Sequence, residues 1–129
     1  ALLTKAKFEN ANLAGADFSE ARLKAVRLKG ARLERTQWAG ATLSGTLVDL
    51  DFSGLDFHGS NLGGANLKGA RFDGADLRKT NFSKANLYGA SFLGADLTDA
   101  TFKGANLREA RLAGARTAGA NFDQARGRD

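Results

Sequence analysis

The chain of 129 residues contains no cysteine, proline or methionine, and only one histidine, one tryptophan and one tyrosine. The lack of cysteine excludes disulfides, thiol chemistry and cysteine metal clusters, and it leaves the redox compartment open. No apolar run approaches the roughly eighteen residues that a membrane-spanning helix needs, so no membrane span is predicted. A single histidine, His58, without a recognisable nucleophile motif gives no support to catalysis.

The length of the chain and its hydrophobic content, 43% of the residues, suffice for one domain with a buried core. The net charge of +5 permits attraction to acidic partners without fixing which. The chain opens "ALLTKAKF", with neither an initiator methionine nor a signal-peptide pattern. We therefore expect a processed product or excised domain of a soluble protein, cytoplasmic or secreted.

A large apolar side chain recurs at every fifth position, in two frames. The first frame runs from Phe8 to Leu43, and the second from Phe52 to Leu112 and Phe122, displaced by one residue. A period of five fits neither the 3.6-residue repeat of a helix nor the two-residue repeat of a strand. One repeat between residues 43 and 52 must have four residues, with Leu47 as its favoured centre and Val48 as the alternative.

Each five-residue unit has the pattern of a very short strand followed by a corner. A small residue stands two positions before most large ones, and the residue between them is polar, as in Ala65-Asn66-Leu67. This is the alternation of a strand, with the small and large residues on one side. The unit commonly ends in glycine, which permits a tight turn. Four such units would close a square coil, and stacked coils would form four parallel ladders at roughly 4.8 Å spacing.

The unit A-(D/N)-(L/F)-x-x, as in "ADLRK", "ANLYG", "ADLTD" and "ANLRE", resembles the pentapeptide repeat family over essentially the whole chain. The resemblance implies an all-β fold, a right-handed quadrilateral parallel β-helix (solenoid) of about six coils. We expect one domain over residues 1–126, with the frame slip between 43 and 52, and a polar tail at 127–129. The resemblance also implies a protein that works by surface contact, in a family that includes secreted effectors and DNA mimics that bind type II topoisomerases.

The large aromatic residues are predicted to fill the centre of the coil. Trp38 falls on one internal column between Phe18 and Phe57. The predicted structural core comprises Phe8, Phe18, Trp38, Phe52, Phe57, Phe72, Phe82, Phe92 and Phe102.

The outward positions fall into columns with different charge. One column is acidic through most of its length, with Asp17, Asp56, Asp76 and Asp96. A second face is basic with one aromatic side chain, and it carries Arg27, Lys29, Lys68, Tyr88 and Arg108. These nine residues form the candidate binding surface.

Two further columns have structural interpretations. Stacked asparagines such as Asn66, Asn86 and Asn106 are expected to hydrogen-bond to one another along their ladder. A third column alternates in charge and is expected to form exposed ion pairs between adjacent coils through Arg32, Asp51, Arg71, the outward Ser91, and Arg111.

These features favour a non-enzymatic protein–protein interaction scaffold, as the repeat domain of a longer bacterial effector or adaptor. The alternative is a DNA mimic that binds DNA gyrase or another type II topoisomerase, which requires a strongly negative surface. Nineteen Lys and Arg against fourteen Asp and Glu disfavour that alternative. We expect another protein as the partner, and no nucleic acid, cofactor, metal or small-molecule substrate, since a straight convex rod offers no pocket.

Overall fold

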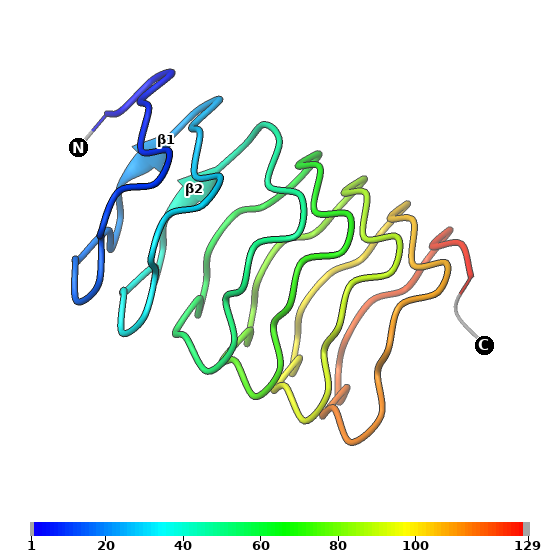
Figure 1. Ribbon diagram of the computed structural model, residues 1–129. Coiled ribbons are helices and arrows are strands. Elements are labelled where there is room, and N and C mark those ends of the chain that lie inside the picture. Colours follow the sequence, from blue (N-terminus) through cyan, green and yellow to red (C-terminus); the bar gives the residue numbers. More distant parts are fainter. Residues whose placement is uncertain (1, 128–129) are drawn as a thin grey trace.

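The computed structural model describes residues 2–127 as an all-β solenoid, and no helix occurs among them. Two short strands, β1 (Arg22–Leu23) and β2 (Thr42–Leu43), pair in parallel with Arg22 opposite Thr42 and Leu23 opposite Leu43. The other coils are joined by single-residue parallel bridges. The coils follow one another in sequence order, from the N-terminal end of the stack to the C-terminal end (Figure 1). In this part of the chain no helix is long and apolar enough to cross a membrane.

Bridges between outward residues form four ladders along the solenoid. Ladder 1 joins Leu2, Arg22, Thr42, Asn61, Asn81, Thr101 and Asn121. Ladder 2 joins Lys7 to Arg27 and, separately, Thr46, Asn66, Asn86, Asn106 and Arg126. Ladder 3 joins Asn12 to Arg32 and, separately, Asp51, Arg71, Ser91 and Arg111. Ladder 4 joins Asp17, Gln37, Asp56, Asp76, Asp96 and Arg116.

Away from the ends of the stack and from the frame slip, the units satisfy their backbone groups in the same way. In the unit centred on Leu67, the Leu67 N–H donates to the Asn86 carbonyl at 2.8 Å and the Gly69 N–H donates to the Tyr88 carbonyl at 2.9 Å. The fifth residue turns the corner with a positive φ, which is 70° at Gly69 and 59° at Lys79. Glycine takes this conformation without strain, whereas a residue with a Cβ takes it at some cost. Glycine therefore favours the corner without being required at every one.

The core consists of stacked rings and leucines inside the coil. Trp38 lies between Phe18 and Phe57, with ring centroids 4.5 and 5.7 Å away. Its indole N–H donates to the Thr36 hydroxyl at 2.7 Å, which satisfies the one polar group of this buried ring. A second stack joins Phe52, Phe72 and Phe92, and a third joins Phe82, Phe102 and Phe122.

The residues of the predicted core point inward, but not all are equally buried. Phe8 is only half-buried, because a single neighbouring coil covers it. Leu112 and Phe122 at the other end of the stack are half-buried for the same reason. Stability from burial is therefore concentrated in the middle coils.

The four-residue unit is 41–44. Thr42 stands opposite Arg22, twenty residues before it, and opposite Asn61, nineteen residues after it. Leu47 is fully buried and Val48 is half-buried, so Leu47 is the centre of the next unit. Of the tail at 127–129, residues 128 and 129 lie outside the described residues.

The short unit interrupts two of the four ladders. No bridge joins Arg27 to Thr46 or Arg32 to Asp51 among the described residues, although ladders 1 and 4 continue through this region. The reason is the register. Because the unit 41–44 is one residue short, residues 46–54 could keep the usual backbone pairing with residues 26–35 only by turning their inward side chains outward. Residues 46–54 keep Leu47 and Phe52 inside, and they give up their pairing with residues 26–35. The trace is more widely spaced there (Figure 1).

Candidate interaction surfaces

The acidic column, Asp17, Asp56, Asp76 and Asp96, lies along ladder 4 on the outside of the coil. Asp17 and Asp56 are exposed, and Asp76 and Asp96 are partly buried. Each carboxylate accepts a hydrogen bond from the N–H two residues later, such as His58 N–H to Asp56 at 2.9 Å. An aspartate or asparagine suits this position because its short side chain can close such a turn. The column is thus partly a product of turn formation, a role that the charge pattern of the sequence does not indicate.

Arg78 neutralises part of the acidic column. Its guanidinium donates two hydrogen bonds to Asp76, at 2.7 and 2.9 Å. These bonds lower the pKa of Asp76 and raise the pKa of Arg78. The charges of Asp96 and Asp56 also raise the pKa of Arg78, so carboxylates on three coils act on one cation.

Neighbouring hydroxyls hold the pKa values of two further members of the column below their usual range. Hydrogen bonds from the side chain and N–H of Ser19 lower the pKa of Asp17. Hydrogen bonds from Thr98 do the same for Asp96, whose carboxylate accepts the Thr98 hydroxyl at 2.6 Å. Both carboxylates are therefore charged at neutral pH.

The basic face, Arg27, Lys29, Lys68, Tyr88 and Arg108, lies along ladder 2 with all five side chains exposed. The Lys68 ammonium lies 5.9 Å from the centre of the Tyr88 ring, within reach of a cation–π contact. Arg27 is 3.9 Å from Glu9, an exposed pair worth at most about 1 kcal/mol.

Asparagines on the outside of ladders 1 and 2 hydrogen-bond from coil to coil. Asn81 donates to Asn61 at 3.1 Å, Asn86 to Asn66 at 3.5 Å, and Asn106 to Asn86 at 3.4 Å. The same carbonyl oxygens accept N–H groups within their own units, as Asn86 does from Tyr88. The asparagine ladders are therefore structural, as predicted.

The prediction that the third column forms ion pairs between adjacent coils is wrong. Arg71 pairs with Asp73 at 3.4 Å and Arg32 with Glu34 at 3.5 Å, each within its own unit. The reason is that an outward residue and the residue two positions later project side by side from the same unit. Arg71 therefore has the Asp73 carboxylate next to it and pairs with it, not with a carboxylate of the neighbouring coil.

Ser91 also departs from expectation, since it is only 7% exposed although it faces outward. Its hydroxyl donates to Asp73, which also accepts the Leu93 N–H at 3.0 Å. Burial raises the pKa of Asp73, but these bonds together with Arg71 outweigh it and leave the pKa lowered. Asp73 and Ser91 thus form a bracket between two coils.

Nothing in the described part of the chain resembles a catalytic or metal centre. His58 is exposed, and its N–H donates to Asp56. No three side chains of His, Asp or Glu come together among residues 2–127 to hold a metal ion.

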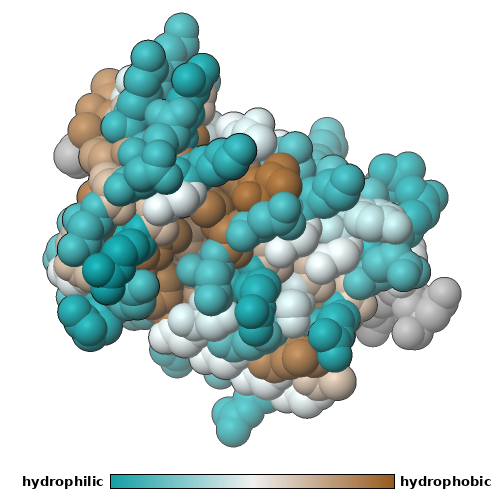
Figure 2. Space-filling view, in the orientation of Figure 1, coloured by the Kyte–Doolittle hydropathy of each residue, from teal (hydrophilic) through white to brown (hydrophobic). Residues whose placement is uncertain are grey.

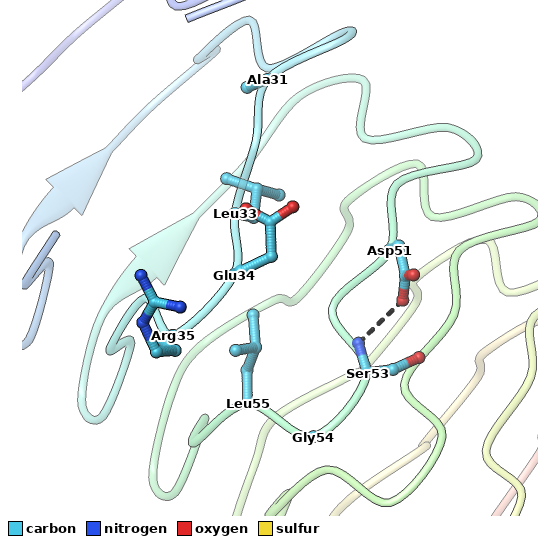
Figure 3. A pocket seen from close by; sticks show the side chains of 8 residues that line it. All are labelled: Ala31, Leu33, Glu34, Arg35, Asp51, Ser53, Gly54 and Leu55. Carbon is cyan, nitrogen blue, oxygen red and sulfur yellow. Dashed lines mark hydrogen bonds between the residues drawn. The ribbon is translucent and has the colours of Figure 1, made fainter. Parts of the chain in front are cut away.

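The expectation of a straight rod without pockets is wrong at the frame slip. Three hollows of about 370, 370 and 440 Å³ lie between residues 25–35 and 45–55, where ladders 2 and 3 are interrupted. In Figure 3, Leu33 and Leu55 lie on facing segments and Leu55 extends toward the segment of Leu33, with Glu34, Arg35 and Asp51 around them. The surface view has a brown hydrophobic area bordered by teal hydrophilic side chains where Figure 1 places the coil after β2 (Figure 2).

Comparisons with known proteins agree with this geometry. A family described as pentapeptide repeats matches in eight copies, over residues 1–36, 21–73, 51–87, 65–104 and 105–129. No curated protein matches the chain by sequence. Rfr23, a pentapeptide repeat protein from the cyanobacterium Cyanothece 51142, has a structure 21% identical in sequence with a TM-score of 0.54, covering 93% of this chain and 86% of that one.

Two further solved structures are similar to a lesser degree. A pentapeptide repeat protein of the Arabidopsis thaliana thylakoid lumen is 32% identical, with a TM-score of 0.43, covering 80% of this chain and 66% of that one. QnrB1, a plasmid-mediated fluoroquinolone resistance protein, is 18% identical in one trypsin-treated form, with a TM-score of 0.40, covering 100% of this chain and 78% of that one.

Proposed function

Because the chain belongs to the pentapeptide repeat family, we propose that it is a non-enzymatic scaffold that binds another protein through its charged outer columns, as the repeat part of a bacterial effector or adaptor. The architecture that goes with this proposal is a right-handed quadrilateral β-helix of about six coils. The partner would contact the acidic column, the basic face, or both.

The observation that supports the proposal is the separation of charge by column. Ladder 4 repeats aspartate on three successive coils, at Asp56, Asp76 and Asp96. Ladder 2 carries the basic face, with no acidic residue among its bridging positions. Turn formation requires a short side chain with an oxygen at the aspartate positions of ladder 4, but asparagine supplies that oxygen equally well in ladder 1, so the turns do not account for the negative charge. Sorted charge orients an approaching partner and raises the association rate more than the affinity.

DNA mimicry is less well supported. It needs a negative surface with the spacing of phosphates. Here Arg78 pairs with Asp76, and Arg116 follows Asp96 on ladder 4. Together with the net charge of +5, these cations leave the acidic column short and isolated. An assay of DNA supercoiling by gyrase with the chain added would detect mimicry as inhibition.

The test removes the charge of the acidic column while keeping its turns. Replacing Asp56, Asp76 and Asp96 with asparagine keeps the side-chain oxygen that closes each turn, as Asn61 and Asn81 do in ladder 1. The matched control removes three negative charges from units of ladders 1 and 3, away from the acidic column and the basic face, by Glu34→Gln, Asp51→Asn and Asp123→Asn. Proteins retained by the immobilised parent chain are identified by mass spectrometry, and the association rate of each is then measured.

We expect the triple asparagine variant to slow association about tenfold at 0.1 M salt, with a smaller effect at 1 M because charges are then screened within about 3 Å. The control should associate like the parent. Equal rates for all three chains would mean that the acidic column is ordinary solvated surface.

A further inference from the structure

The interruption of ladders 2 and 3 leaves an opening in the solenoid between residues 26–35 and residues 46–54, which we call its two lips. The first lip, residues 26–35, has free backbone donors. In the described chain, the four N–H groups of residues 26–35 that stand where other coils donate to the next coil, those of Leu28, Gly30, Leu33 and Arg35, donate no hydrogen bond. The equivalent groups one coil later, in Leu47, Asp49, Phe52 and Gly54, all donate to the next coil at 2.7–2.9 Å. Because these positions are chemically alike, the difference lies in the missing partner.

The facing lip, residues 46–54, has free acceptors. Among the described residues, no group donates to the carbonyls of Thr46, Val48, Asp51 or Ser53. The Ser53 hydroxyl oxygen is also buried without a hydrogen-bond partner. Backbone groups left without partners are costly, and a row of them along an extended edge is a template for another strand.

The opening between the lips reaches the core. Leu50 and Leu55 are 8% and 7% exposed, whereas Ala70 and Ala75 at the equivalent positions of the next coil are 0% and 1% exposed. Leu33, across the gap from Leu55 (Figure 3), is 5% exposed. The volume of each hollow falls within the range of about 300–1,000 Å³ that is usual for ligand sites.

The lining of the opening indicates what would occupy it. An extended peptide presents alternating N–H and C=O groups along both edges, and it is therefore the ligand that satisfies two open strand edges. The hollow beside Ala25 and Val26 has only basic charged residues in its lining, namely Lys5, Lys7 and Arg27. Lys29 lines the next hollow, with Asp49 as the one acidic residue there. A peptide with carboxylates over ladder 2 matches this charge.

We propose that the opening between residues 26–35 and 46–54 binds an extended peptide segment of a partner protein, whose backbone completes the interrupted ladders. Its carboxylates would lie over the basic hollows of ladder 2, and not over the ladder 3 hollow that Glu34, Arg35 and Asp51 line. Apolar side chains of the segment would lie against Leu33, Leu50 and Leu55. The opening takes Arg27 and Lys29 from the basic face, so this proposal specifies what part of that face would bind. It is separate from the acidic column and does not depend on the proposed role of ladder 4.

The test uses a fluorescein-labelled octapeptide of alternating valine and aspartate, with binding to the full chain followed by fluorescence anisotropy. One comparison peptide carries lysine in place of aspartate. A second is N-methylated at every other residue, which removes the donors of one edge and leaves the charge unchanged. We expect the acidic peptide to bind at least tenfold more tightly than either comparison peptide.

The matched variant closes the opening without changing charge. Inserting one glycine between Ser44 and Gly45 restores a five-residue unit, so that residues 46–54 can pair with residues 26–35 in register. This variant should bind the acidic peptide at least tenfold more weakly while keeping the β-type circular dichroism of the parent.

Should the insertion disturb folding, the triple change Lys5→Gln, Lys7→Gln and Arg27→Gln tests the same site. Its control, Lys79→Gln, Lys84→Gln and Lys103→Gln, removes three positive charges from other coils. We expect tenfold weaker binding for the first variant alone. Equal binding by both would overturn the proposal.

Three other results would also overturn it. The parent chain could fail to bind the acidic peptide up to millimolar concentration. The N-methylated peptide could bind as well as the unmodified one, which would indicate surface charge alone. The parent could dimerise at micromolar concentration in a way that the glycine insertion abolishes, which would identify a second copy of this chain as the occupant.

Discussion

Replacing Phe92 with alanine tests how the stacked interior holds the coils together. The Phe92 side chain is fully buried, and its ring lies parallel to that of Phe72 with centroids 5.4 Å apart. It also meets Phe82 and Phe102 edge to face, at 5.7 and 5.8 Å. Truncation of a buried phenylalanine costs about 3–5 kcal/mol through lost transfer energy and the cavity left behind. We expect the upper half of this range, because ladders above and below prevent the coils from collapsing into the cavity.

Phe8→Ala is the matched control, since Phe8 is half-buried and has one ring neighbour, Phe18, at 6.1 Å. Its loss should cost about 1–2 kcal/mol. Equilibrium urea unfolding measures both, followed by far-ultraviolet circular dichroism and by the fluorescence of Trp38. Coincident curves from the two probes would establish a single transition, which repeat proteins do not always show. Equal costs for Phe92→Ala and Phe8→Ala would refute the view that stacking in the middle coils dominates stability.

Three further predictions concern polar groups. Ser91→Ala should lower the free energy of unfolding by about 1–2 kcal/mol, because it removes a donor from the partly buried Asp73 carboxylate. The Ser83 hydroxyl makes no hydrogen bond in the described chain, so Ser83→Ala should keep the free energy of unfolding within about 0.5 kcal/mol of the parent in the same urea titration. The lowered pKa values of Asp17, Asp73, Asp76 and Asp96 imply stability that is present above the unfolded-state pKa of about 3.9 and lost as pH falls through the lower folded-state values. The urea concentration at the unfolding midpoint, measured from pH 7 to pH 2.5, should therefore decrease once the pH is below about 4. A midpoint that does not change with pH would contradict the hydrogen bonds to these carboxylates. Asn86→Ala removes bonds to Asn66, Tyr88 and Asn106 and should cost about 1–2 kcal/mol, whereas an unchanged thermal midpoint would show that the ladder contributes no stability.

The periodicity of the sequence predicts most of the fold. A period of five is incompatible with a long helix or strand, and the small-polar-large order within a unit indicates which side chains point inward. Thus Leu47 and Trp38 lie inside the coil as the pattern requires. The position of the short unit also follows from the sequence, because the frame changes after Leu43.

The consequences of the short unit could not be read from the pattern. Periodicity gives the register of each unit, but it does not say whether a coil that is one residue short closes over its neighbour. That depends on whether residues 46–54 can keep their large side chains inside the coil and also pair their backbone with residues 26–35. The outcome is set by the geometry of the whole coil, not by any single unit. The opening lined by Leu33 and Leu55 was missed for this reason, although the four-residue unit itself was the signal.

Charge pairing was mispredicted because a column map records which coils are neighbours and not how far a side chain reaches. Arg71 has Asp73 beside it in its own unit, closer than any carboxylate of the adjacent coil. Likewise, Ser91 is buried and hydrogen-bonded to Asp73 of the preceding coil, a contact that the column map does not contain. The sequence predicts the columns themselves, but these lateral contacts require coordinates.

Amide hydrogen exchange measured by NMR tests most directly whether the four-residue unit opens the solenoid. The N–H groups of Leu28, Gly30, Leu33 and Arg35 have no acceptor, whereas those of Leu47, Asp49, Phe52 and Gly54 occupy the same positions one coil later and are hydrogen-bonded. We predict that the first four exchange at least a hundredfold faster than the second four, a difference of about 2.7 kcal/mol in opening free energy, since each factor of ten is about 1.4 kcal/mol. Equal protection of the two sets would mean that the coils are closed at the frame slip, and the peptide site would not exist.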